Sequence, residues 1–230
     1  VSFYMRILRS VYNKAVGEGI ASQRAPFEKV YTGVDKTRKR AVDMATIESL
    51  RKLDLRGSRS LAYARDLFVF SFYMRGMAFV DMAYLRKSDV RDQTAQYIRR
   101  KTGQSLCIRL EPCITEIIRR YARKTKNSPY VFPIIAATDE NEAYAQYQNA
   151  LSYYNKLLKK LSKLLQADTP LSSYVSRHTW ATTARNCDIP LSVISAGLGH
   201  RSQATTQIYL ASLEDSVIDE ANRKIIFSLN

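Results

Sequence analysis

The sequence predicts a mainly α-helical domain with one small antiparallel β-sheet. Most of the chain after residue 41 carries apolar side chains at helical spacing, and capping residues precede several of these segments. Residues 96–110 differ, because apolar side chains there alternate on either side of a turn near Gly103, as in a β-hairpin. Of the 230 residues, 46% are hydrophobic, which is enough for one well-formed core.

The first 40 residues differ in character from the rest. Residues 1–20 carry apolar side chains three or four positions apart and end in Gly17 and Gly19, which predicts a helix. Neither a capping residue nor a methionine precedes it, so we expect the last helix of a truncated upstream domain. Residues 21–40 lack periodicity and end in a basic run, which predicts an interdomain linker. Residues 41–230 are then the second domain, including a C-terminal helix.

Capping residues mark the helices of the second domain. Asp43 is placed to cap a helix that ends near residue 53, and Ser58 one that continues to residue 74. Pro112 suits the first turn of another helix, and Asp139 with Glu142 resembles a capping box. The remaining helices are expected over residues 78–85, 172–187, 190–198, 202–211 and 214–227.

The charge predicts a polyanionic partner. Lys and Arg number 36 against 21 Asp and Glu, a formal net charge of +15. The basic residues are spread along the chain, unlike those of a disordered tail. The alternative is a basic surface that is merely solvated. The residues expected to line a nucleic-acid groove are Lys36, Arg38, Lys39, Arg40, Arg100, Lys156, Lys159, Lys160, Lys163 and Arg201.

The cysteine pattern suggests neither a disulfide framework nor a metal site. Cys107, Cys113 and Cys187 have no metal-ligand spacing, and we interpret them as buried or incidental thiols in a reducing compartment. No apolar run approaches a membrane span. We therefore expect a cytoplasmic protein, without metal or other cofactor.

Three short motifs near the C-terminal end carry groups suited to phosphodiester chemistry. They are Arg177-His178-Thr179, Leu198-Gly199-His200 and Thr205-Thr206-Gln207-Ile208-Tyr209. Attack on a phosphodiester requires a nucleophilic oxygen and fixed positive donors for the two non-bridging oxygens. An arginine fork donates two parallel hydrogen bonds and keeps its charge. A tyrosine ester preserves the energy of the broken bond, so that rejoining needs no nucleotide cofactor.

These motifs, in this order and at this spacing, resemble the C-terminal motifs of the tyrosine recombinase (phage integrase) family. In that family a tyrosine follows the histidine of Leu-Gly-His by nine residues, as Tyr209 follows His200 here. Weaker similarity extends back through Lys101-Thr102-Gly103. The sequence most resembles integrases of mobile elements from Bacteroides-like bacteria. The resemblance implies the family's catalytic-domain fold, with residues 1–20 as the end of a core-binding domain.

The resemblance also implies roles for individual residues. Tyr209 would attack the phosphorus, Arg177 would hold the scissile phosphate, and His200 would lie beside it as a donor. Lys101 on the hairpin would protonate the leaving 5′ oxygen, whereas His178 is expected to be structural. The partner would be double-stranded DNA, bound by a homotetramer that is monomeric in free solution.

The sequence departs from the family pattern at two positions. Tyr174 stands where the family usually has a histidine, and a phenol is a poor base at neutral pH. Ala78 occupies the register of the family's first arginine. We expect Arg75, one helical turn earlier, to place its guanidinium in the vacated position, with Arg65 as the alternative.

Three other functions are compatible with the sequence. The two departures are compatible with a DNA-binding relative that has lost cleavage. A type IB topoisomerase-like enzyme would share the tyrosine chemistry and act alone on supercoiled DNA. An RNA-binding helical module would account for the charge alone.

Overall fold

The computed structural model of the protein describes residues 2–32, 41–200, 202–203 and 205–206. Contacts within the chain divide it into two compact units, Val1–Lys39 and Arg40–Asn230. Tyr209 lies outside the described residues. The expected DNA-binding residues Lys36, Arg38, Lys39, Arg40 and Arg201 also lie outside them.

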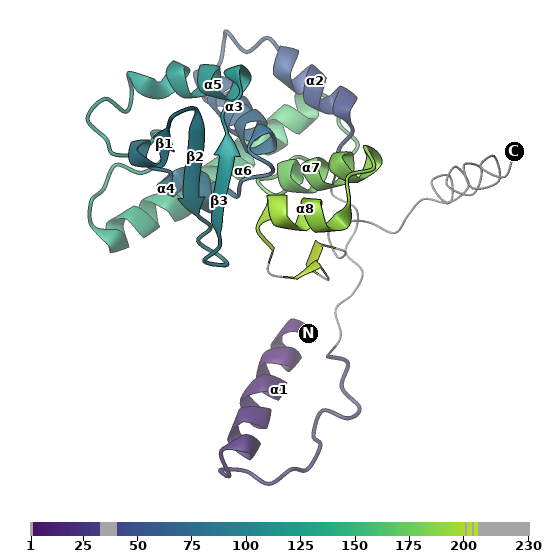
Figure 1. The fold of residues 1–230 in the computed structure, drawn as a ribbon. Coiled ribbons are helices and arrows are strands. Elements are labelled where there is room, and N and C mark those ends of the chain that lie inside the picture. Colours follow the sequence, from purple (N-terminus) through teal and green to yellow (C-terminus); the bar gives the residue numbers. More distant parts are fainter. Residues whose placement is uncertain (1, 33–40, 201, 204, 207–230) are drawn as a thin grey trace, which may run out of the picture. The chain divides into compact units, whose positions relative to one another are not determined.

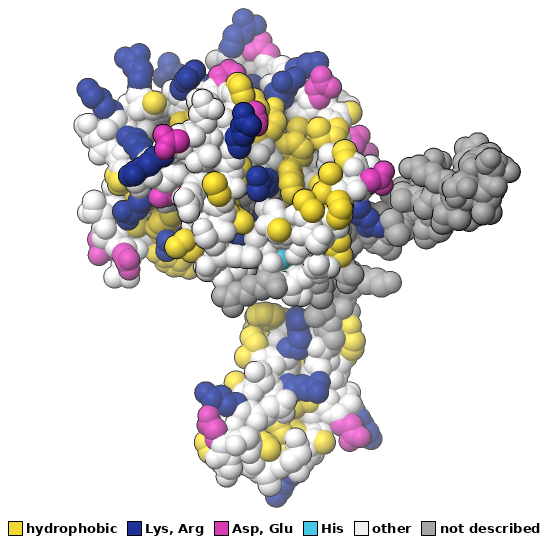
Figure 2. All heavy atoms as spheres, viewed as in Figure 1, with side chains coloured by type: hydrophobic (Ala, Val, Ile, Leu, Met, Phe, Trp, Pro, Cys, Tyr) yellow, Lys and Arg dark blue, Asp and Glu magenta, His cyan; other side chains and the backbone are white. Residues whose placement is uncertain are grey.

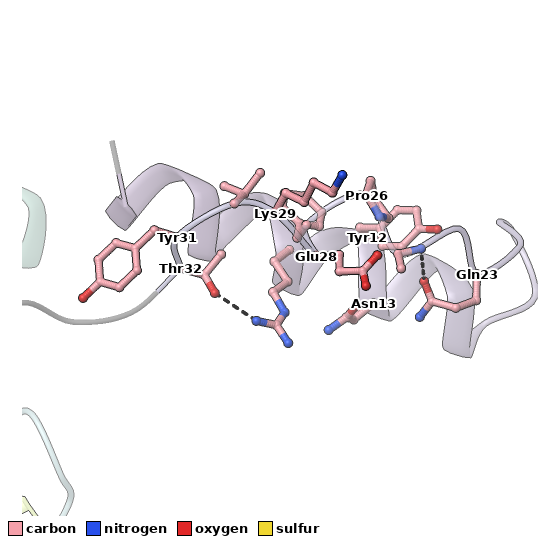
Figure 3. A pocket seen from close by; sticks show the side chains of 12 residues that line it. Tyr12, Asn13, Gln23, Pro26, Glu28, Lys29, Tyr31 and Thr32 are labelled. Atoms are coloured by element: carbon pink, nitrogen blue, oxygen red, sulfur yellow. Dashed lines mark hydrogen bonds between the residues drawn. The ribbon is translucent and has the colours of Figure 1, made fainter.

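The smaller unit is built on helix α1 (Ser2–Gly17), which ends at the glycine that the sequence predicted. The residues after it run back along the helix (Figure 3). The Tyr12 hydroxyl donates to the Ser22 carbonyl oxygen at 2.8 Å and accepts from the Arg24 N–H at 2.8 Å. The Tyr12 and Phe27 rings lie edge to face, 6.0 Å apart. Part of the segment expected to be a linker is therefore packed against α1.

The larger unit contains the helices and the sheet shown in Figure 1. Its core is a large apolar cluster in which helices α3 and α6 pack together, with two smaller apolar clusters besides. In chain order the elements are α2 (Met44–Lys52), α3 (Arg59–Tyr73), α4 (Phe79–Tyr84), the 3₁₀ turn η1 (Lys87–Asp89), β1 (Val90–Arg91), β2 (Thr94–Ile98), β3 (Ser105–Arg109), α5 (Pro112–Ala122), α6 (Glu140–Leu164), α7 (Val175–Asn186) and α8 (Leu191–Leu198). The predicted fold class, mainly helical with a small antiparallel sheet, is confirmed.

The predicted caps are present. The side chains of Asp43, Ser58 and Asp139 accept hydrogen bonds from backbone N–H groups in the first turns of α2, α3 and α6. These bonds satisfy N–H groups that a helix leaves without partners at its start. Helix α7 begins three residues later than predicted, because the Val175 N–H closes a turn on the Ser172 carbonyl oxygen at 3.0 Å.

The sheet has three antiparallel strands in the order β1-β2-β3. Ala95 pairs with Ile108 and Tyr97 with Leu106, and all four side chains are buried. The hairpin of β2 and β3 was predicted, whereas the two-residue strand β1 was not. Asp92 and Gln93, both at positive φ, connect β1 to β2.

The cysteine interpretation is corrected in part. Cys107, Cys113 and Cys187 are all exposed free thiols, so the structure excludes burial as the reason for their presence. Among the described residues, no three His, Cys, Asp or Glu side chains are grouped so that they could hold a metal ion. No helix within the described ranges has the length and apolarity needed to cross a membrane.

Candidate active site

Arg177 is a buried cation at the meeting point of three segments. It lies in the first turn of α7 and is 3% exposed. Its Nη1 donates to the carbonyl oxygen of Gly76 at 2.8 Å, and its Nη2 donates to that of Leu198. Nη2 also lies 3.1 Å from Nε2 of His200. Because a buried charge is costly without hydrogen bonds, these partners fix the orientation of the guanidinium.

Gly76 allows the turn after α3 to approach Arg177. Its φ of +69° is in the region that favours glycine, and a Cβ there would lie 2.6 Å from the Cα of Arg177. Ser71 holds the same turn, because its carbonyl oxygen accepts from the Gly76 N–H at 2.8 Å. The Ser71 hydroxyl lies 2.7 Å from that of Ser176, the neighbour of Arg177. Residues 71–76 are therefore attached to α7 through both Ser176 and Arg177.

The helical relation that we expected between Arg75 and Ala78 is wrong. Helix α3 ends at Tyr73, Arg75 has a φ of +56°, and Ala78 is the extended N-cap residue of the next helix. Arg75 nevertheless lies near the end of α8, where Leu198 accepts a hydrogen bond from Arg177. Its Cδ would lie 3.8 Å from a Cβ at Gly197, one residue before Leu198.

The alternative arginine, Arg65, is held by a different cluster. Its Nε donates to the Asp66 carboxylate at 3.0 Å, and its Nη1 donates to the Leu53 carbonyl oxygen at 2.9 Å. Asp66 also accepts from Arg120 at 3.2 Å and from the Tyr121 hydroxyl at 2.8 Å. These bonds give Arg65 a structural position between α2, α3 and α5.

His200 is a neutral ring held between two partners. A guanidinium offers only donors, so Nε2 must accept the hydrogen bond from Arg177. The proton is therefore on Nδ1, which donates to the Thr206 hydroxyl at 2.8 Å. Burial, with the nearby charges of Arg177, Arg99 and Lys101, lowers the pKa of His200 to about 4. The bond to Thr206 attaches the loop after α8 to the segment that leads to Tyr209.

The hairpin carries Lys101 to the same region. Lys101 is exposed at the turn between β2 and β3, and its charge is one of those that lower the pKa of His200. The Arg100 N–H donates to the buried Asp81 carboxylate at 2.9 Å, and the Arg100 guanidinium lies 3.9 Å above the Tyr84 ring. Burial raises the pKa of Asp81, although the neighbouring arginines oppose the shift.

Sequence reasoning did not single out Arg99. It stands in a basic run with Arg100 and Lys101, of which only these two were assigned roles. The structure buries Arg99 to 3% exposure, with Nη1 donating to the Gly199 carbonyl oxygen at 2.8 Å. The signal was present in the strand pattern, because Ala95 and Tyr97 face inward and a residue two positions further on faces the same way.

Tyr174 lies at the N-cap position of α7 and is 36% exposed. Its ring centroid is 6.0 Å from that of His178, one turn further along the helix. His178 is half-buried.

The predicted basic face of α6 is present. Lys156, Lys159, Lys160 and Lys163 are all exposed, whereas Leu157, Leu158 and Leu161 of the same helix are buried. Basic side chains are not confined to this helix. In Figure 2 they also gather over α5 and the neighbouring sheet. Charge alone therefore does not identify the DNA-binding face.

The neutral state of His200 predicts a pH dependence of stability. Because its pKa falls from 6.5 to about 4 on folding, its contribution is complete above about pH 6.5 and is lost as the pH falls towards 4. His200→Gln keeps an acceptor for Arg177 and a donor for Thr206 but does not titrate. Urea unfolding of both proteins should show the stability advantage of the wild type shrinking over this range, by at most about 1.4 kcal/mol per pH unit.

The second histidine provides the control for this measurement. The sequence contains 2 His, and the variant His178→Gln reports how much of the pH dependence belongs to His178. A constant difference between wild type and His200→Gln from pH 7 to 4.5 would contradict the assigned tautomer and its burial.

Comparison with known proteins identifies the family of this chain. Residues 42–215 match the model of the phage integrase family. Lambda integrase (residues 75–356) has a similar fold, with a TM-score of 0.64 and 16% identity over 90% of this chain and 71% of that chain. The Tn1549 transposon integrase gives a TM-score of 0.63 and 16% identity over 95% and 77% of the two chains. XerA recombinase gives 0.58 and 18% identity over 91% and 71%. No curated protein matches the sequence.

Because the family match covers well over half of the chain, the protein is a member of the phage integrase family, the tyrosine-type site-specific DNA recombinases.

Proposed function

We propose that this recombinase cleaves and rejoins DNA through a 3′-phosphotyrosyl ester formed by Tyr209. The observation that supports this most directly is the chain of contacts from Arg177 through His200 to Thr206. Thr206 precedes Tyr209 by three residues. The segment that carries the nucleophile is thus attached to a fixed guanidinium. Attack by the phenolic oxygen forms the ester, breaks the bond from phosphorus to the 5′ oxygen, and needs no cofactor.

Arg177 and His200 supply the positive and polar surroundings of the phosphate in this proposal. A cation that is already held by carbonyl oxygens stabilises developing negative charge without reorganising. In this structure His200 accepts from Arg177 through Nε2. For His200 to donate to a phosphate oxygen through Nε2, the ring must take up a second proton, which the phosphate charge favours, or change to the tautomer in which Nδ1 accepts from the Thr206 hydroxyl. Tyr174 lies three residues before Arg177, and in this proposal its hydroxyl is a further hydrogen-bonding group at the phosphate.

Lys101 acts as the general acid in this proposal. An exposed lysine on a hairpin turn can reach a leaving oxygen, and the proton it supplies prevents departure of an unstable alkoxide. Arg75 supplies the second guanidinium. Its half-buried position near Gly197 supports this role, whereas the bonds of Arg65 to Asp66 and Leu53 argue against the alternative.

The proposed substrate is duplex DNA, held by four protomers that bring two duplexes together on the nucleoid. The structure of lambda integrase holds a dimer bound to a COC′ core site, and that of the Tn1549 integrase contains a circular intermediate DNA. These relatives support DNA as the partner. The lysines of α6 and the basic residues at 36–40, with Arg100 and Arg201, provide the contacts to phosphates.

Trapping the covalent intermediate tests the proposed chemistry. A duplex selected for binding from a random library, and nicked close to the cut site, loses its short cleaved strand and prevents rejoining. The wild type should accumulate a covalent protein–DNA adduct, and Tyr209→Phe should form none while binding equally well. Tight binding without an adduct would support the alternative of a cleavage-deficient relative, with which Ala78 is compatible. Relaxation of plasmids that lack a specific site would support a topoisomerase.

The second guanidinium is tested with paired variants. Arg75→Ala should slow adduct formation by roughly 100-fold or more, with the Kd for DNA almost unchanged. Arg65→Ala should instead lower the melting temperature, because it leaves the buried Asp66 with fewer donors. Normal cleavage by Arg75→Ala, together with its loss in Arg65→Ala, would reverse the assignment.

The basic face of α6 is tested by salt dependence. The double variant Lys159→Glu, Lys163→Glu should weaken binding to all DNA sequences and reduce the slope of log Kd against log salt by about 2. Lys124→Glu with Lys126→Glu changes the net charge equally and is the matched control, since both lysines are exposed beyond α5. Equal effects of the two pairs would mean that α6 has no special role in binding.

A further inference from the structure

The tip of the β2–β3 hairpin is fastened to the loop that carries His200. Two side chains of the hairpin donate to one carbonyl oxygen, that of Gly199: Arg99 through Nη1 at 2.8 Å and Thr102 through Oγ1 at 3.3 Å. Arg99 is 3% exposed, so its bond is shielded from water. A charged donor in such surroundings forms one of the stronger hydrogen bonds available to a protein.

The position of Gly199 explains why the hairpin can come so close. Gly199 ends α8 with a φ of +63°, and a Cβ there would lie 3.0 Å from Leu106 Cδ1 and 3.2 Å from Arg99 Cδ. With any other residue here, the side chains of Leu106 and Arg99 would have to shift. The contact therefore depends on glycine at this position, both for the backbone conformation and for the space.

The two hydrogen bonds to Gly199 lie on either side of Lys101 in sequence. Their donors are Arg99 and Thr102, and the Gly103 N–H closes the turn on the Arg99 carbonyl oxygen at 2.8 Å. The acceptor, Gly199, immediately precedes His200. The two bonds thus relate the backbone of Lys101 to that of His200, although the two residues are about a hundred positions apart in sequence.

We propose that Arg99 is a positioning residue, which holds the Lys101 hairpin against the Gly199 carbonyl oxygen so that Lys101 reaches the leaving 5′ oxygen. The inference rests on the proposed role of Lys101 as general acid. Arg99 does not touch DNA in this proposal, in contrast to its exposed neighbour Arg100. Its removal should impair protonation of the leaving group more than DNA binding or nucleophilic attack.

A sulfur leaving group separates these effects. In a substrate whose bridging 5′ oxygen is replaced by sulfur, attack by Tyr209 breaks the bond from phosphorus to sulfur, and a thiolate departs without needing a proton. A thiol has a pKa of about 8.5, far below that of an alcohol.

The experiment measures single-turnover adduct formation with the oxygen and sulfur substrates, for the wild type and for Lys101→Ala, Arg99→Met and Arg109→Met. Arg109 lies on β3 with its side chain 76% exposed and is the matched control.

With the oxygen substrate, Arg99→Met should slow adduct formation roughly 10- to 100-fold, because small misplacements of a catalytic group have effects of that size. With the sulfur substrate its rate should return to within about 3-fold of the wild type, as should that of Lys101→Ala. Arg109→Met should match the wild type on both. Kd for DNA and the melting temperature establish that the variants bind and fold.

The outcomes distinguish the proposed role of Lys101 as general acid from the proposed role of Arg99 as its positioning residue. Failure of sulfur to rescue Lys101→Ala would overturn the role of Lys101. Rescue of Lys101→Ala but not of Arg99→Met, or an unimpaired Arg99→Met, would overturn the positioning role alone. If Arg99→Met does not fold, Thr102→Val removes the other donor to Gly199 and should give a smaller, equally rescuable loss. A Thr102→Val defect that sulfur does not rescue would also overturn the inference.

Discussion

The burial of the Arg177 guanidinium is the constraint on which the site depends. A charge that is 3% exposed is tolerated only where its N–H groups find acceptors, and Arg177 finds them on the turn after α3, at the end of α8 and on His200. These acceptors lie 101, 21 and 23 positions from Arg177 in sequence. The hydrogen bonds that make the buried charge acceptable therefore also bring the parts of the site together. The result is a cation whose orientation is set before substrate arrives, as electrostatic stabilisation of a transition state requires.

The surroundings of Arg177 contain more positive than negative charge. Arg99 and Lys101 act with Arg177 on His200 and help to keep it neutral, while Asp81 is a buried carboxylate whose pKa is raised by burial despite the nearby arginines. Like charges brought together in a poorly solvated region repel one another. A phosphate diester would supply the missing negative charge. The same excess that limits the stability of the folded domain is thus useful to an enzyme that binds DNA.

The sequence was most informative where local chemistry decides the structure. The caps at Asp43, Ser58 and Asp139 and the turn at Gly103 depend on neighbouring residues, and all were predicted. Strand β1 was missed because two residues give no periodicity. The turn at Arg75 was missed because tertiary contacts decide it, whereas the burial of Arg99 was missed although the alternation of β2 indicates it. A basic run looks uniform in sequence until the alternation of the strand turns Arg99 inward and leaves Arg100 exposed.

The chemistry of helix ends explains why arginines hold this site together. The last carbonyl groups of a helix have no partners within it, and the C-terminal end carries partial negative charge. At the end of α8 the Leu198 carbonyl oxygen accepts from Arg177 and that of Gly199 accepts from Arg99. Two cations from distant elements thus cap one short helix, and His200 follows directly. Because the acceptors are backbone atoms, their positions depend on the conformation of the helix end rather than on any side chain. Gly199, whose lack of a side chain favours that conformation and the close approach of the hairpin, therefore helps to place Arg177, His200 and Lys101 without contributing a functional group of its own.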